Sequence, residues 1–150
     1  MRGPVLAPGR ARRFDGGMTR ILLLLTLVAA VIVPAAAAMD AMPVTVVKAP
    51  KVGAIAATSA KLPLYTWSKE KSGMVDCTGS CTMTWRPLTV AAHTMVAKHV
   101  MGLMGTLGTT HRPDGKTQVT LNGHPLYTHH GDTPTKFLTA GMDGWHVVRA

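Results

Sequence analysis

The chain of 150 residues lacks the sequence motifs of the common enzyme classes. It has no serine nucleophile elbow, no H-E-x-x-H metal motif, no phosphate-binding loop and no G-x-G-x-x-G segment. Its lysines and arginines are spread along the chain and do not form a basic stripe interleaved with aromatic residues. These absences argue against an enzyme and against a nucleic-acid-binding protein. We therefore expect no catalytic residues and no nucleic-acid partner.

An apolar segment near the N terminus predicts export. Arg20 precedes an apolar run over residues 21–33, which Pro34 and an A-x-A site at 36–38 follow. This order is typical of a secretory signal peptide, here residues 1–38, and Met18 is the better-placed translation start. The alternative is an uncleaved anchor, because residues 21–38 just reach membrane-spanning length. The protein is expected in the periplasm or outside the cell, as a candidate cell-envelope component, with membrane contact only through an uncleaved signal peptide.

Cysteine is scarce, and Cys77 and Cys81 are the only two. Their C-x-x-x-C spacing is neither the thioredoxin-like nor the haem-attachment pattern. In an exported chain, two cysteines this close with Gly79 between them are typical of a structural disulfide. A redox-active or metal-binding dithiol is the alternative.

Acidic residues are also few. After removal of residues 1–38, eleven lysines and arginines face six aspartates and glutamates, so the mature chain carries a net charge of +5. This surplus favours solubility and a weak attraction to anionic surfaces.

Strand signals are stronger than helix signals in the remaining chain. Residues 43–48 and 144–149 are rich in β-branched residues. Residues 107–130 contain Asp-Gly and Asn-Gly turns between alternating segments, which predicts a three-stranded meander.

The Asn-Gly turn fixes a predicted register in this meander. It pairs Leu121 with His124, Val119 with Leu126, and Gln118 with Tyr127. Val119, Leu121 and Leu126 should face the core, while the opposite face carries Gln118, Thr120, Pro125 and Tyr127. Because Pro125 lacks an N–H, its strand should lie at an edge.

A short repeat divides the domain into two related units. The string Pro-Leu-Tyr-Thr occurs at 63–66 and again at 125–128, and Trp85 and Trp145 follow at similar distances. Each unit alone would bury too little apolar surface to be stable, whereas two units could share a core. We expect an N-terminal strand and linker over 39–59, repeat 1 over about 60–90, and repeat 2 over about 105–150. The fold class is a mostly β, small antiparallel domain of two strand-loop units, with an optional short helix near 91–104.

Residues 60–148 resemble bacterial secreted-repeat, lipoprotein-type proteins that share a Tyr-x-aromatic-x-x-Asp motif. In this chain the motif falls on Tyr65, Trp67 and Glu70, and again on Tyr127, His129 and Asp132. Glutamate replaces aspartate in the first copy, and histidine replaces the aromatic residue in the second. The resemblance implies export and a repeat fold but no particular chemistry. The chain departs from lipoprotein members because no cysteine follows its apolar segment.

Two groups of residues carry functional alternatives. Glu70 and Asp132 occupy equivalent loop positions and could face each other as an acid and base pair, or Asp132 could accept hydrogen bonds from loop amides. Soft thioether and imidazole ligands, which favour copper, are concentrated at His93, Met95, His99, Met101 and Met104. The alternative for this segment is an apolar face of Met95, Val96, Val100, Leu103 and Met104. The function expected is therefore non-catalytic binding of an unassigned ligand without a cofactor, with a copper-binding or redox accessory protein as the alternative.

Overall fold

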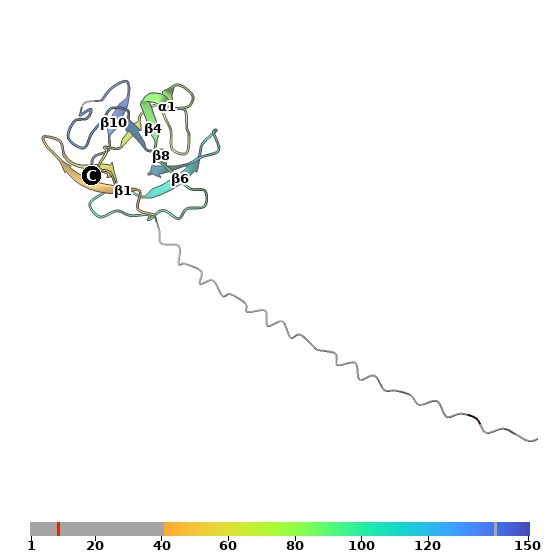
Figure 1. The fold of residues 1–150 in the computed structure, drawn as a ribbon. Coiled ribbons are helices and arrows are strands. Elements are labelled where there is room, and N and C mark those ends of the chain that lie inside the picture. Colours follow the sequence, from red (N-terminus) through yellow and green to blue (C-terminus); the bar gives the residue numbers. More distant parts are fainter. Residues whose placement is uncertain (1–8, 10–40, 140) are drawn as a thin grey trace, which may run out of the picture. The chain divides into compact units, whose positions relative to one another are not determined.

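The computed structural model describes Gly9 and residues 41–139 and 141–150, and this part of the chain is mostly β (Figure 1). The predicted signal peptide, the Met18 start and the alternative anchor lie outside the described residues. Within the described part, no helix is long and apolar enough to cross a membrane.

The first hairpin consists of β1 (Val44–Ala49) and β2 (Gly53–Thr58). The two strands pair antiparallel from Val44 opposite Thr58 to Ala49 opposite Gly53. The expected strand is therefore present, but the expected linker is a second strand. Its sequence GAIAAT has low intrinsic strand propensity, and pairing with β1 together with burial of three of its residues outweighs that preference.

The second hairpin confirms the predicted meander. It consists of β6 (Leu107–His111) and β7 (Thr117–Leu121), and β8 (His124–Pro125) follows the Asn-Gly turn. Asn122 and Gly123 have φ of 51° and 82°, the left-handed conformation that a two-residue hairpin turn requires.

The predicted register holds as far as Leu126 and then fails. Leu121 lies opposite His124, and the Leu126 N–H donates to the Val119 carbonyl over 2.9 Å. Gln118, however, pairs with Thr89 of β5 (Thr89–Val90) instead of Tyr127. All five residues of β7 are buried, so its second face is not the outer surface.

A four-stranded sheet occupies the centre of the fold, in the order β10 (Trp145–Val147), β3 (Tyr65–Trp67), β9 (Tyr127–His129), β4 (Trp85–Pro87). At its middle Tyr65 lies opposite Tyr127. The predicted edge position applies only to Pro125, because β8 pairs with β7 alone and β9 is an inner strand.

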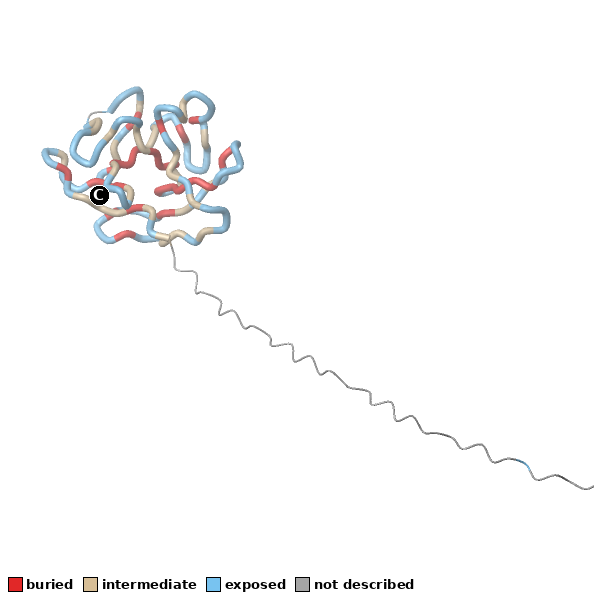
Figure 2. The backbone as a smooth tube through the Cα atoms, in the orientation of Figure 1, coloured by how far each residue is buried: buried red, intermediate tan, exposed pale blue. Residues whose placement is uncertain are grey.

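The two repeats exchange their last strands. The strand β4 of repeat 1 pairs with β9 of repeat 2, and β10 of repeat 2 pairs with β3 of repeat 1. The residues just after these strands continue the pairing through backbone hydrogen bonds. Leu88, after β4, is hydrogen-bonded to Leu126 and Val119, and Val148, after β10, is hydrogen-bonded to Leu64 and Ala56. In Figure 2 buried residues lie mainly toward the inside of the domain and exposed residues mainly in the outer loops. Neither repeat therefore completes its own sheet.

The short helix lies elsewhere than expected. It is α1 (Cys81–Thr84), and residues 91–104 form turns and extended chain with no helix. In that segment Val100 and Leu103 are buried, but Met95 and Met104 are exposed. The predicted apolar face is thus wrong for its methionines.

Candidate functional site

The repeat-motif residues meet at the centre of the domain in two reciprocal pairs. The hydroxyl of Tyr65 donates to Asp132 Oδ2 over 2.6 Å, and the hydroxyl of Tyr127 donates to Glu70 Oε1 over 2.7 Å. Each tyrosine therefore binds the acid of the other repeat. Both tyrosines are fully buried, since they lie on the inner strands of the central sheet.

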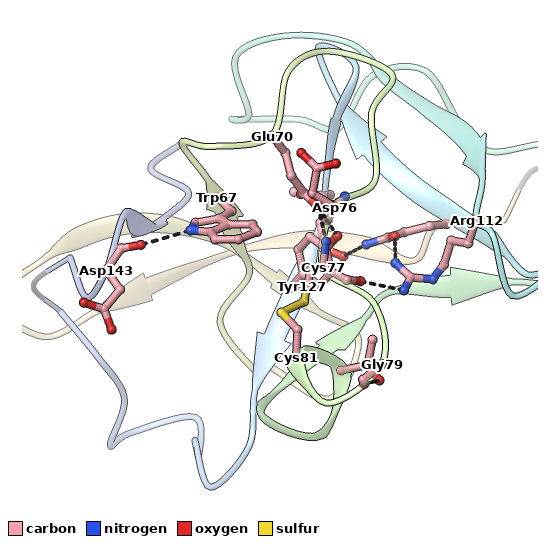
Figure 3. The surroundings of a disulfide bond; sticks show 12 residues. Trp67, Glu70, Asp76, Cys77, Gly79, Cys81, Arg112, Tyr127 and Asp143 are labelled. Carbon is pink, nitrogen blue, oxygen red and sulfur yellow. Dashed lines mark hydrogen bonds between the residues drawn. A yellow bond between two sulfur atoms is a disulfide. The ribbon is translucent and has the colours of Figure 1, made fainter.

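Glu70 is buried in the loop after β3 and organises that loop (Figure 3). Its Oε1 also accepts the backbone N–H groups of Asp76 and Cys77, over 2.8 and 2.9 Å. Oε2 is buried without a hydrogen-bond partner among the described residues. Loop amides therefore bind Glu70, whereas the sequence led us to expect them at Asp132.

Asp132 is held differently from Glu70. Its Oδ1 lies 3.0 Å from Nδ1 of His129, whose side chain is partly exposed. Tyr65, Asp132 and His129 therefore form a connected polar group beside a shallow cavity of about 230 Å³ lined in part by His130 and Lys136. Glu70 and Asp132 therefore bind different tyrosines, and no hydrogen bond joins the two acids in the described part of the chain.

Burial and the acidic partners raise the pKa of both tyrosines. Desolvation is the larger cause for Tyr65, and the hydrogen bond and negative charge of Asp132 add to it. Desolvation likewise raises the pKa of Tyr127, with Glu70 contributing in the same way. Both hydroxyls consequently remain protonated donors at neutral pH.

The tryptophans pack over these pairs. The rings of Trp85 and Trp145 stack with centroids 3.9 Å apart, and Trp145 also stacks on Trp67 at 5.2 Å. Each tyrosine meets the tryptophan of its own repeat edge-on, Tyr65 against Trp85 and Tyr127 against Trp145. Trp85 and Trp145 are both about 95% buried, which confirms that they are core residues in equivalent positions.

The predicted disulfide between Cys77 and Cys81 is present, and Cys77 is fully buried beside Glu70 (Figure 3). The structure adds a buried group that the sequence reasoning missed. Arg112 donates to the Cys77 carbonyl over 2.8 Å and to Gln118 Oε1, and Gln118 donates to the Leu126 carbonyl. The only feature of the sequence that could have indicated this role is that Arg112 directly precedes the Pro-Asp-Gly turn. The local sequence does not show that this turn places the Arg112 side chain in the core.

The predicted metal ligands lie in an exposed segment. The side chains of Met95, Met101 and Met104 are 66%, 95% and 80% exposed, and His93 and His99 are exposed as well. Among the described residues, no group of three or more His, Cys, Asp or Glu side chains could hold a metal ion. A site here would have to use thioether sulfur.

Comparison with known proteins identifies the family. Residues 46–89 and 108–149, more than half of the chain, match the Lipoprotein_15 family, described as a secreted repeat of unknown function. The first match begins inside β1 and includes β2, so it covers most of the range 39–59 that we expected as a strand and linker before repeat 1. No curated protein and no solved structure matched the chain. The chain therefore belongs to this family of secreted repeats.

Proposed function

We propose that this exported protein is a non-catalytic binding domain that recognises anionic components of the cell envelope. The observation that carries the proposal is the charge of its surface. Among the described residues, ten lysines and arginines are exposed, whereas only Asp76, Asp114 and Asp143 are exposed acids. Glu70 and Asp132 bind the buried tyrosines and are not exposed, so the surface is more cationic than the composition indicates.

The central polar groups support a structural role instead of a catalytic one. Both oxygens of Asp132 and one of Glu70 accept hydrogen bonds from groups that hold the two repeats or a loop together. Such acceptors are committed to the fold, which leaves the exposed cations as the groups available to a partner. The attraction is expected to weaken with salt.

Sedimentation of the exported protein with lipid vesicles tests this function. We expect binding to vesicles containing phosphatidylglycerol, little binding to phosphatidylcholine alone, and release at high salt. Replacing Lys48, Lys69 and Lys71 by glutamine should weaken binding, and arginine at the same positions is the charge-matched control. Equal binding to neutral and anionic vesicles, or none to either, would contradict the proposal.

A second candidate function is binding of a soft metal such as copper(I). It is favoured by the exposure of all seven methionines in the described part of the chain, since methionine usually fills gaps in cores. Three of them lie with His93 and His99 in one segment of twelve residues, 93–104. Thioether and imidazole are ligands suited to copper(I).

Competition between the protein and a chromophoric chelator for copper(I) tests this candidate. Replacing Met95, Met101 and Met104 by leucine removes sulfur while keeping side-chain size, and should lower the affinity. Leucine at Met42, Met74 and Met83 is the matched control and should leave the affinity unchanged. Equal loss in both triple variants would show that no localised site exists.

A further inference from the structure

The two hairpin turns differ at equivalent positions. The registers of β1 with β2 and of β6 with β7 align Ala49 with Arg112, Pro50 with Pro113, and Lys51 with Asp114. The backbone hydrogen bonds agree with this alignment. The N–H of Val52 donates to the Ala49 carbonyl, and the N–H of the equivalent Gly115 donates to the Arg112 carbonyl. The two turns thus have the same length but differ in side chains and in backbone, because the positive φ lies at Lys51 in the first and at Gly115 in the second.

In the second hairpin, Arg112 fills the space between the turn and the loop that follows Glu70. Its side chain is 1% exposed and reaches the Cys77 carbonyl in that loop, with Asp114 3.4 Å from its Nε. The cation is therefore internal there and is paired with a carboxylate.

In the first hairpin, Ala49 has no side chain long enough to fill the corresponding space. A cavity of about 530 Å³ lies between the turn, including Lys51, and the loop that follows Asp132. Lys136 and Thr139 of that loop line it, and Arg149 closes one side. Arg149 occupies the position that Thr89 has beside the other hairpin. Arg149 forms a β-bridge with Ile55, and Thr89 pairs with Gln118, the residue equivalent to Ile55.

The cavity is cationic and has no acid in its lining. Lys51, Lys136 and Arg149 are exposed, and none is within ion-pair distance of a carboxylate among the described residues. One N–H of Arg149 donates to the Val52 carbonyl over 2.8 Å, which fixes the guanidinium at the rim. Phe137 adds an apolar surface to the same lining.

We propose that this cavity binds the phosphate group of an organic phosphate, an inference that rests on the proposed function and names its site. Arginine binds phosphate oxygens through its planar N–H groups, and lysine acts as a point charge. The hydroxyls of Thr135 and Thr139 supply further donors, and Phe137 receives the organic part of the ligand. A phosphate ester, in solution or in a lipid headgroup, carries this combination of groups.

Titration of the ¹⁵N-labelled exported protein with phenyl phosphate tests the site. We expect amide shifts at Val52, Lys136 and Thr139, and weaker binding of inorganic phosphate, which lacks the apolar part. Lys136→Gln should weaken phenyl phosphate binding by about fivefold, whereas Lys98→Gln, which removes one exposed charge outside the cavity, should not. Lys51→Asn is a second variant, because asparagine tolerates the φ of 65° at this position. Shifts confined to other regions, or equal losses in the Lys136 and Lys98 variants, would overturn the proposal.

A vesicle experiment separates the two sources of phosphate. Displacement of the protein from phosphatidylglycerol vesicles by phenyl phosphate would place the lipid headgroup in the cavity. Phenyl phosphate binding in the cavity without displacement would assign it to a soluble phosphate ester. Vesicle binding that is unaffected by Lys51→Asn and Lys136→Gln, with no phenyl phosphate shifts at the cavity, would refute the site and leave the broader anionic-surface function intact. Absence of binding to every anionic probe would refute both.

Discussion

Tyr65 donates its hydroxyl to Asp132, a residue of the other repeat that lies 67 positions later in the chain. The equivalent bond from Tyr127 to Glu70 runs in the opposite direction. Because the last strand of each repeat also pairs with the other, each half depends on its partner for sheet pairing and for its buried acid. Each repeat can therefore be recognised in the sequence, but the two repeats must fold together as one unit.

Removing the Tyr127 hydroxyl should be more destabilising than removing that of Tyr65. Glu70 is fully buried and would keep two backbone N–H donors at Oε1, but its Oε2 has no partner among the described residues. Asp132 instead keeps His129 and lies beside a shallow cavity. We expect Tyr127→Phe to lower the free energy of unfolding by about 1.5–3 kcal/mol and Tyr65→Phe by less. Chemical denaturation measures both, and an equal or larger loss in Tyr65→Phe would contradict the assignment.

The stacked tryptophans should be major contributors to stability. Trp85→Ala or Trp145→Ala removes a buried large aromatic side chain and should cost about 3–5 kcal/mol. Trp67→Ala should cost less because Trp67 is only partly buried. In single-tryptophan variants, an aqueous quencher should reach Trp67 but hardly reach Trp85 or Trp145. Strong quenching of either of the latter would refute their place in the core.

Reduction of the disulfide should loosen one loop without unfolding the domain. Cys77 and Cys81 are four residues apart, so the closed loop is short and the bond contributes only about 2 kcal/mol by the chain-entropy model. We expect no free thiol in native protein and a modest fall in melting temperature after reduction. Serine at both cysteines is the matched variant, and complete loss of the folded state on reduction would show a larger role.

Local sequence was sufficient for the second hairpin but not for the first. Asn122-Gly123 and Asp114-Gly115 are turn sequences, so they predict the strands β6, β7 and β8, and the Asn-Gly turn also predicts the register as far as Leu126. Residues 53–58 carry alanines and a glycine in place of strand-forming residues, and only pairing with β1 makes them a strand.

The candidate site shows the same limit at longer range. The spacing within the repeat motif showed that Tyr65 corresponds to Tyr127 and Glu70 to Asp132. It could not show that each tyrosine binds the acid of the other repeat. That exchange follows from strand order, which local patterns do not encode. The burial of Arg112 and the open cavity at Lys51 likewise depend on which loop the turn meets.

Alkaline pH should destabilise the protein through its two tyrosines, which are the only ones in the chain. Burial and the acidic partners raise the pKa of Tyr65 and Tyr127 in the folded state, so folding favours the protonated form. This stabilisation is therefore complete below the unfolded pKa of about 10 and is lost as pH rises above it toward the folded values. In that range each tyrosine should remove about 1.4 kcal/mol of stability per pH unit. Ultraviolet absorbance of phenolate should therefore appear together with loss of structure, whereas protein in denaturant should titrate near pH 10. Tyr65→Phe should leave one coupled tyrosine and halve the slope, and ionisation of either tyrosine near pH 10 in folded protein would show that its hydroxyl is not held as the structure places it.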